Sequence, residues 1–188
     1  MDQQGNVSAD RQIEALAHRL QAVERRIEAA CARARRRRSE VTLVAVSKTR
    51  SIEEIEAGYA CGLRHLGENR VEEAALKVPP LRERHAADPI TWHMIGHVQS
   101  RKAGEAVQFC DVIHSVDSKR LMERLDRIAA QMGKRIPILL ELNVSGEPSK
   151  YGFAAHDGPA MDRTIDELAA CGDLANLDIR GLMTMAPI

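Results

Sequence analysis

The sequence is short of aromatic residues, carries no net charge and has no long apolar run. Five of its 188 residues are aromatic, although 44% are hydrophobic, so we expect an aliphatic core. The 27 basic side chains balance 27 acidic ones, which gives no electrostatic reason to bind nucleic acid or an anionic membrane. No apolar run approaches the roughly 18 residues of a spanning helix. Because a secretory signal is also missing, we expect a cytoplasmic protein with no nucleic-acid or membrane partner.

The four cysteines lack the spacing of a redox pair or a zinc site. They lie far apart in the chain, at Cys31, Cys61, Cys110 and Cys171, and we expect them to be reduced and structural. His93 and His97 have metal-site spacing, but they span a strand end and a turn instead of one helical face. The sequence therefore predicts no metal site.

The hydrophobic periodicity changes near residue 40. Apolar residues at helical spacing, such as Ile13, Leu16, Leu20 and Ile27, predict a helix over residues 8–38. The arginine run at its end is more readily interpreted as a solvated face than as an anion site. From residue 41 onward, apolar runs of strand length alternate with helical patterns. Strands are predicted at 41–46, 63–67, 92–96, 112–116, 136–144 and 179–185, the first buried on both faces, with helices between them. Pro79-Pro80 is expected to end the second of those helices.

Alternating strands and helices indicate a parallel sheet. Six such units fit either a doubly wound sheet or a (β/α)8 barrel. No glycine-rich phosphate turn follows the first strand, where the chain reads Val46-Ser-Lys-Thr-Arg50. We therefore predict an α/β fold of the TIM-type (β/α)8 barrel class, truncated to about six β/α units over residues 41–188, with an N-terminal helix in residues 1–40 packing on it.

Barrels place their chemistry at the carboxyl ends of the strands. Lys48 lies at the end of the first strand, after a continuous apolar run. A lysine held in a dry wall has a lowered pKa and a free lone pair for attack on a carbonyl, as a Schiff-base lysine requires. Lys48 extending into solvent fits the position equally well. Asn69, Asn143 and Thr184 are polar residues at other strand ends.

Six ordered motifs make the chain similar to a known family. They are Val44-Ala-Val-Ser-Lys-Thr49, Gly67-Glu-Asn69, Trp92-His-Met-Ile-Gly-His-Val-Gln-Ser100, His114-Ser-Val-Asp117, Asn143-Val-Ser-Gly-Glu-Pro-Ser-Lys-Tyr-Gly152 and Arg180-Gly-Leu-Met-Thr-Met185. Together they resemble the pyridoxal 5'-phosphate homeostasis protein family, also called the YggS/PROSC family. The fold of that family resembles the N-terminal barrel of alanine racemase.

The resemblance implies that Lys48 carries pyridoxal 5'-phosphate (PLP) as a Schiff base and that Asn69 lies near the cofactor. Asn143 and Thr184 are carried over only as pocket walls. The implied role is intracellular PLP homeostasis and amino-acid and keto-acid balance without turnover of its own, with PLP-dependent apoenzymes as partners.

Two alternatives stay open beside this carrier. A PLP-dependent racemase needs acid–base groups on both faces of the cofactor, and the only tyrosines, Tyr59 and Tyr151, are expected in a helix and a loop. A barrel scaffold that binds no cofactor is the second alternative. The phosphate-binding segments of the family, near its seventh and eighth strands, have no match here, so we expect weak cofactor binding. The intact family fold implies a monomer, whereas unpaired first and sixth strands would favour self-association.

Overall fold

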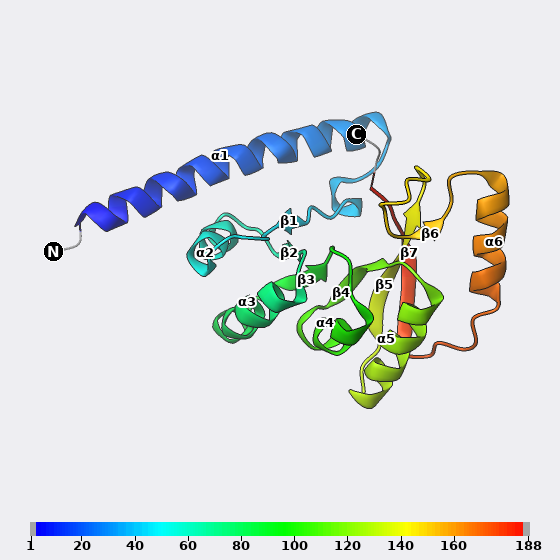
Figure 1. Ribbon diagram of the computed structural model, residues 1–188. Coiled ribbons are helices and arrows are strands. Elements are labelled where there is room, and N and C mark those ends of the chain that lie inside the picture. The colour runs from blue at the N-terminus through cyan, green and yellow to red at the C-terminus, as the bar shows by residue number, and fades with distance from the viewer. Residues whose placement is uncertain (1–2, 186–188) are drawn as a thin grey trace.

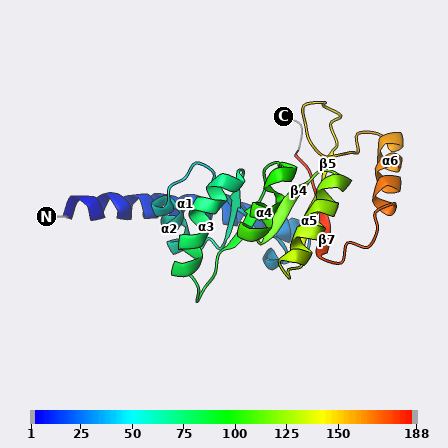
Figure 2. The ribbon, with the colours of Figure 1, turned by 60° about the horizontal axis from the view of Figure 1, so that its bottom comes forward.

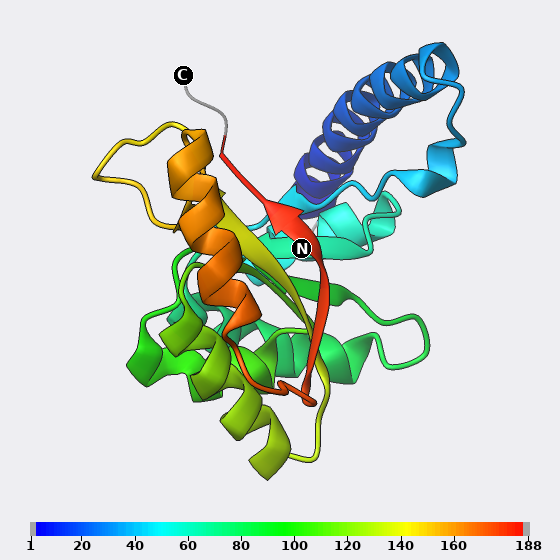
Figure 3. The same ribbon diagram turned by 90° about the vertical axis from the view of Figure 1, so that its right-hand side faces the viewer.

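The computed structural model describes residues 3–185, with side chains from Ile13 onward. Its sheet is parallel throughout and contains β1 (Ala45–Val46), β2 (His65–Glu68), β3 (Thr91–Met94), β4 (Val112–Val116), β5 (Ile136–Asn143), β6 (Phe153–Ala154) and β7 (Leu177–Met183). The strands from β1 to β5 pair in chain order, and β5 then pairs with both β6 and β7 (Figure 3). A doubly wound sheet reverses its strand order, whereas a barrel continues in one direction. The predicted barrel class is confirmed; the short strand β6 was not predicted.

The helices follow the strands in the same order. Along one side of the sheet lie α2 (Ile52–Ala60), α3 (Val71–Arg84), α4 (Ala103–Phe109) and α5 (Lys119–Gln131) (Figure 1). At the far end of the sheet, α6 (Gly158–Ala169) follows β6. Two short 3-10 helices, η1 (Arg38–Glu40) and η2 (Ser100–Lys102), precede β1 and α4. Ser51 forms the capping box that its sequence predicts, because its side chain accepts from the Glu54 amide while the Glu54 carboxylate accepts from the Ser51 amide.

The core lies between this helical layer and the sheet, and it is aliphatic as predicted. Met94, Ile113, Val116 and Leu125 are completely buried there, and Trp92 is the largest buried side chain. On β2, β3 and β4, the side chains that alternate with these core residues point to the face away from the helices. Packing therefore fixes which side chains reach the concave face.

The N-terminal helix is longer at its start and shorter at its end than predicted. Helix α1 (Gln3–Arg33) extends well past α2 (Figures 1 and 2), and the Cys61 thiol donates to the Ile13 carbonyl, which joins the two helices. Arg38 binds Glu24 with an Nε–Oε2 distance of 2.6 Å, and Arg37 binds Glu40 at 3.0 Å. Part of the arginine run is thus paired with carboxylates of the same chain.

The prediction that Pro79-Pro80 ends its helix is wrong, because α3 continues through both residues to Arg84. Each proline removes the hydrogen bond to the carbonyl four residues earlier. Those carbonyls belong to Ala75 and Leu76, and the Leu76 side chain is 76% exposed, so this side of the helix faces water. Val78 and Leu81 are fully buried on the opposite side and hold the helix to the core.

The first strand is also shorter and more exposed than predicted. Only Ala45 and Val46 form β1, and the Val46 side chain is 50% exposed. A strand buried on both faces needs a layer on each side. Helices cover one face of β1, whereas no described element covers Val46 on the other, so the predicted burial on both faces is wrong.

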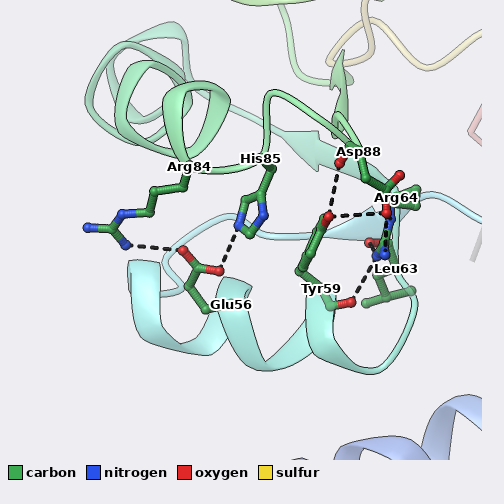
Figure 4. Close-up of polar contacts among 7 residues, drawn as sticks. All are labelled: Glu56, Tyr59, Leu63, Arg64, Arg84, His85 and Asp88. Carbon is green, nitrogen blue, oxygen red and sulfur yellow. Dashed lines mark hydrogen bonds and ion pairs between the residues drawn. The ribbon is translucent and has the colours of Figure 1, made fainter.

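A polar cluster lies at the amino ends of β2 and β3. The Tyr59 ring stacks on His85 and lies under the Arg64 guanidinium, each at 3.7 Å, while Asp88 accepts from both Tyr59 and Arg64 (Figure 4). Glu56 accepts from Arg84 and His85. This is the end of a barrel where interactions serve stability, opposite the end where barrels place their chemistry.

Candidate functional site

Lys48 lies two residues beyond β1, at the carboxyl edge of the sheet. The Ser47 amide before it still donates to the Gly67 carbonyl of β2, at 2.9 Å. Lys48 is exposed, so of the two environments that the sequence left open for it, the structure shows the solvent-exposed one. The other five lysines each donate to an oxygen acceptor, whereas Lys48 donates to none among residues 13–185. The Lys48 amine is therefore accessible to a ligand because it is exposed and has no acceptor among the described residues.

Asn69 occupies the equivalent position after β2. Val46 of β1 pairs with Gly67 of β2 in parallel register. Lys48 and Asn69 each follow two residues later, so they lie at neighbouring strand ends. Asn69 is half-buried. A Cβ added to Gly96, after β3, would lie 2.2 Å from the Asn69 carbonyl oxygen, so the two backbones approach as closely as only glycine permits. The sheet edge thus brings the two predicted cofactor residues to adjacent strand ends.

A buried ionic network lies behind Lys48, on the helical side of the sheet. The Lys77 amine donates to Glu68 at 2.9 Å and to Glu73 at 2.8 Å. Burial acts to lower the pKa of Lys77, but the hydrogen bonds to Glu73 and Glu68 outweigh it and raise that pKa. The hydrogen bond from Lys77 lowers the pKa of Glu73 in turn. Sequence reasoning missed this network; the i,i+4 spacing of Glu73 and Lys77 on one helix was the available signal.

Three histidines form a chain on the concave face. His65 Nδ1 lies 3.0 Å from His93 Nε2, and His93 Nδ1 lies 2.8 Å from His114 Nε2. A neutral imidazole has one donor and one acceptor nitrogen, so both contacts form only when all three rings share one tautomer. The pKa of His93 is lowered to about 4. Burial is the largest cause, and repulsion from the positive charges of protonated His114 and His65 adds to it. His114 lies within β4, and no group of metal-binding residues occurs among residues 13–185.

A pocket of about 370 Å³ lies beside the ends of β3 and β4. His97 Nδ1 is 2.9 Å from Asp117 Oδ2, and the His97 ring stacks on Tyr151 at 3.7 Å. Glu141 is buried, and burial and then the charge of Asp117 raise the pKa of its carboxyl group. This pocket is lined by both polar and apolar side chains, and Tyr151, which the sequence placed in a loop, forms one of its walls.

The two predicted pocket walls differ in what they do. Asn143 Nδ2 donates to the carbonyls of Glu147 and Lys150, and its Oδ1 accepts from the Gly146 amide, so its amide group organises the loop after β5. Thr184 is exposed, and its hydroxyl donates to the Leu142 carbonyl. Backbone groups therefore occupy both polar side chains, within its own loop for Asn143 and across to β5 for Thr184.

The family model of the alanine racemase N-terminal domain matches residues 18–188. The pyridoxal phosphate homeostasis protein of Pseudomonas aeruginosa is 35% identical over 170 residues, which cover 90% of this chain and 70% of that protein. The chain belongs to the pyridoxal phosphate homeostasis protein family. The protein of that name from Synechocystis is 37% identical over 148 residues, 79% of this chain, and the match spans 64% of the relative's length.

Solved structures agree with this family assignment. PipY of Synechococcus elongatus, solved with PLP bound, is 37% identical, with a TM-score of 0.66 over 92% of this chain and 71% of that one. A Bifidobacterium adolescentis protein is 36% identical, with a TM-score of 0.75 over 98% of this chain and 72% of that one. Alanine racemase of Clostridium difficile, at 15% identity and a TM-score of 0.59 over 78% of this chain and 36% of that one, shares the fold. No helix within residues 3–185 is long and apolar enough to cross a membrane.

Proposed function

We propose that this chain holds PLP as a Schiff base on Lys48 and acts in PLP homeostasis. The observation that carries the proposal is the free, exposed Lys48 amine at the carboxyl edge of a parallel sheet, beside the end of the strand that carries Asn69. The PLP-bound structure of the related PipY supports the same ligand class. When bound, the cofactor supplies an aldehyde, with which an amine condenses with loss of water. Lys48 is the residue that would attach it, and Asn69 would orient it.

A carrier fits the described residues better than a racemase does. Tyr59 lies at the opposite end of the sheet, where His85 and Arg64 cover its ring. Tyr151 stacks on His97 beside β3 and β4. A tyrosine facing Lys48 across a planar cofactor would support racemisation, and neither side chain is held for that role. We accordingly propose a cytoplasmic carrier that delivers PLP to PLP-dependent apoenzymes.

An absorbance titration with PLP tests the attachment. The purified chain should develop a near-visible band, and Lys48→Ala should abolish it. Lys119→Ala is the matched control, because Lys119 binds Glu123 on α5 and should leave the band unchanged. A band that persists in Lys48→Ala would contradict the proposal, and its absence from the wild-type chain at saturating PLP would favour the scaffold alternative.

Exchange of α-deuterium separates a carrier from an enzyme. The PLP-loaded chain is incubated with α-deuterated amino acids, and mass spectrometry follows the loss of deuterium. We expect no catalytic loss, while an added PLP-requiring apoenzyme should gain activity from the loaded chain. Deuterium loss over many turnovers would establish the racemase alternative instead.

A further inference from the structure

The Lys77 side chain comes from α3 and is almost completely buried. Its ammonium group reaches three oxygen acceptors: the Ser47 carbonyl at 2.9 Å, Glu68 Oε1 at 2.9 Å and Glu73 Oε2 at 2.8 Å. An ammonium group has three protons, so these contacts use its entire donor capacity. Lys77 is therefore fixed in one position, with no proton left for a ligand.

The acceptors of Lys77 hold the residues on both sides of Lys48. Before it, the Ser47 carbonyl accepts from Lys77, and the Ser47 hydroxyl donates to Glu68 Oε1 at 2.8 Å. After it, the Thr49 amide donates to Glu73 Oε2 at 2.7 Å. One buried ammonium thus connects both peptide neighbours of Lys48, while the Lys48 side chain itself remains exposed.

The backbone at Thr49 needs such support. Its φ of 62° lies in the left-handed region, which β-branched residues adopt at an energetic cost. A conformation of this kind persists only where its surroundings determine it. The contact from the Thr49 amide to Glu73 supplies that constraint directly, and Lys77 holds the same carboxylate oxygen.

Burying the charges of this network also costs free energy, because the charged groups lose their contact with water. Two carboxylates share one ammonium, and the second oxygen of Glu68, Oε2, is buried with no partner among residues 13–185. Well-packed apolar side chains often stabilise a core as well as a buried ion pair does, so burial of these charges calls for another explanation. The turn that carries Lys48 is the element that the network holds.

We propose that Lys77 is a positioning residue, which acts through Ser47 and through Glu73 on Thr49 to fix the turn that carries Lys48. The inference rests on the proposed attachment of PLP to Lys48. A fixed turn aims the Lys48 amine at one place on the sheet edge, where a bound aldehyde can meet it. Without the network the amine remains exposed, but its direction varies and reaction with a bound cofactor slows.

The test measures the rate of PLP attachment at Lys48, trapped by borohydride and quantified by peptide mass spectrometry. The variants are Lys77→Met, which removes the ammonium, and Glu73→Ala, which releases Thr49. We expect each to lower the rate by about tenfold, the scale of one lost charge-assisted hydrogen bond. Glu73→Gln should recover much of the rate, because its amide oxygen can still accept from Thr49. Glu72→Ala is the matched control on the same helical turn, since Glu72 binds Lys102 outside the network.

Two readouts separate positioning from a general structural effect. Reductive methylation of Lys48 by formaldehyde needs only an exposed amine, so its rate should be unchanged in every variant. Amide hydrogen exchange at Thr49 should become faster in Glu73→Ala without any cofactor. If Lys77→Met does not fold, Glu73→Ala is used for the test instead. The Glu73 side chain is 25% exposed in the wild-type chain, so its removal disturbs the core less.

The outcomes distinguish the two claims. Attachment in the wild-type chain with unchanged rates in Lys77→Met and Glu73→Ala would overturn the positioning role alone. Equal slowing of PLP attachment and formaldehyde methylation would also overturn it, because it would show a general loss of Lys48 access. No attachment to Lys48 in the wild-type chain would overturn the proposed function, and the inference with it.

Discussion

His93 is the central member of the histidine chain, and its burial has a consequence for stability. Its pKa in the folded state is about 4, below its ordinary value of 6.5. The unfolded chain therefore takes up a proton as the pH falls through 6.5, while the folded chain keeps His93 neutral until about pH 4. The stability that this residue contributes is complete above pH 6.5 and is lost progressively between about pH 6.5 and 4.

We predict that His93 accounts for about 2 kcal/mol of stability lost between pH 7 and pH 5. Urea unfolding at the two pH values measures the loss. In His93→Gln, which cannot titrate but retains a donor and an acceptor, the loss should be smaller by that amount. An equal loss in both proteins would show that His93 is not held neutral by the fold.

For individual residues, the sequence predicted the location of Lys48 but not its surroundings. Lys48 was singled out by its place after an apolar strand and by the family resemblance, and the structure places it at that edge of the sheet. The sequence left open whether its side chain is buried or exposed, because that depends on what covers the concave face. The Lys77 network was missed because Ser47, Glu68 and Lys77 meet only once β1, β2 and α3 have packed together.

At the scale of elements, the close approach of Gly96 to Asn69 couples the ends of β2 and β3. A methyl group on residue 96 would meet the Asn69 carbonyl oxygen at 2.2 Å and its Cα at 2.8 Å, so the backbone must move. We predict that Gly96→Ala lowers the free energy of unfolding by about 1–3 kcal/mol, the usual cost of overpacking, and weakens PLP binding by displacing Asn69.

Gly104→Ala is the control for this substitution. Nothing lies within 4 Å of the added methyl group there, and the position is in α4, where alanine favours the helix. Urea unfolding should show Gly104→Ala to be at least as stable as the wild-type chain. The account of the strand ends would be contradicted if Gly96→Ala were as stable as Gly104→Ala.

Element boundaries followed from the sequence where caps or periodicity defined them. Ser51 caps α2 and Ser118 caps α5, and each is a common capping residue type that precedes an apolar helical pattern. The proline pair in α3 failed as a stop signal because the burial of Val78 and Leu81 outweighs the lost hydrogen bonds. Local propensity predicts an element only until tertiary packing overrides it.

For the whole molecule, the barrel class was predictable, whereas the burial of the first strand was not. Regular alternation indicated a parallel sheet but fitted a doubly wound sheet as well, and the missing glycine-rich turn after the first strand favoured the barrel. Among the described strands, β1 pairs only with β2, and β7 pairs only with β5. Ile179 and Leu182 on β7 are 50% and 64% exposed. An edge with exposed apolar side chains is a template for pairing with another chain.

We therefore predict that the 188-residue chain self-associates through these edges. Sedimentation velocity should show concentration-dependent dimers or larger species, and Leu182→Lys should shift the chain toward the monomer because a charged edge resists pairing. Leu76→Lys is the control, since Leu76 is 76% exposed on helix α3 and belongs to neither edge strand. A monomer at every concentration would contradict this prediction.

The attachment of PLP to Lys48 is the central claim, and site mapping tests it most directly. The chain is incubated with PLP, reduced with borohydride, digested and analysed by mass spectrometry. Five of the six lysines donate to acceptors, whereas Lys48 has none among residues 13–185, so we predict one dominant adduct on Lys48. Adducts spread over the other lysines, or none on Lys48, would contradict the account.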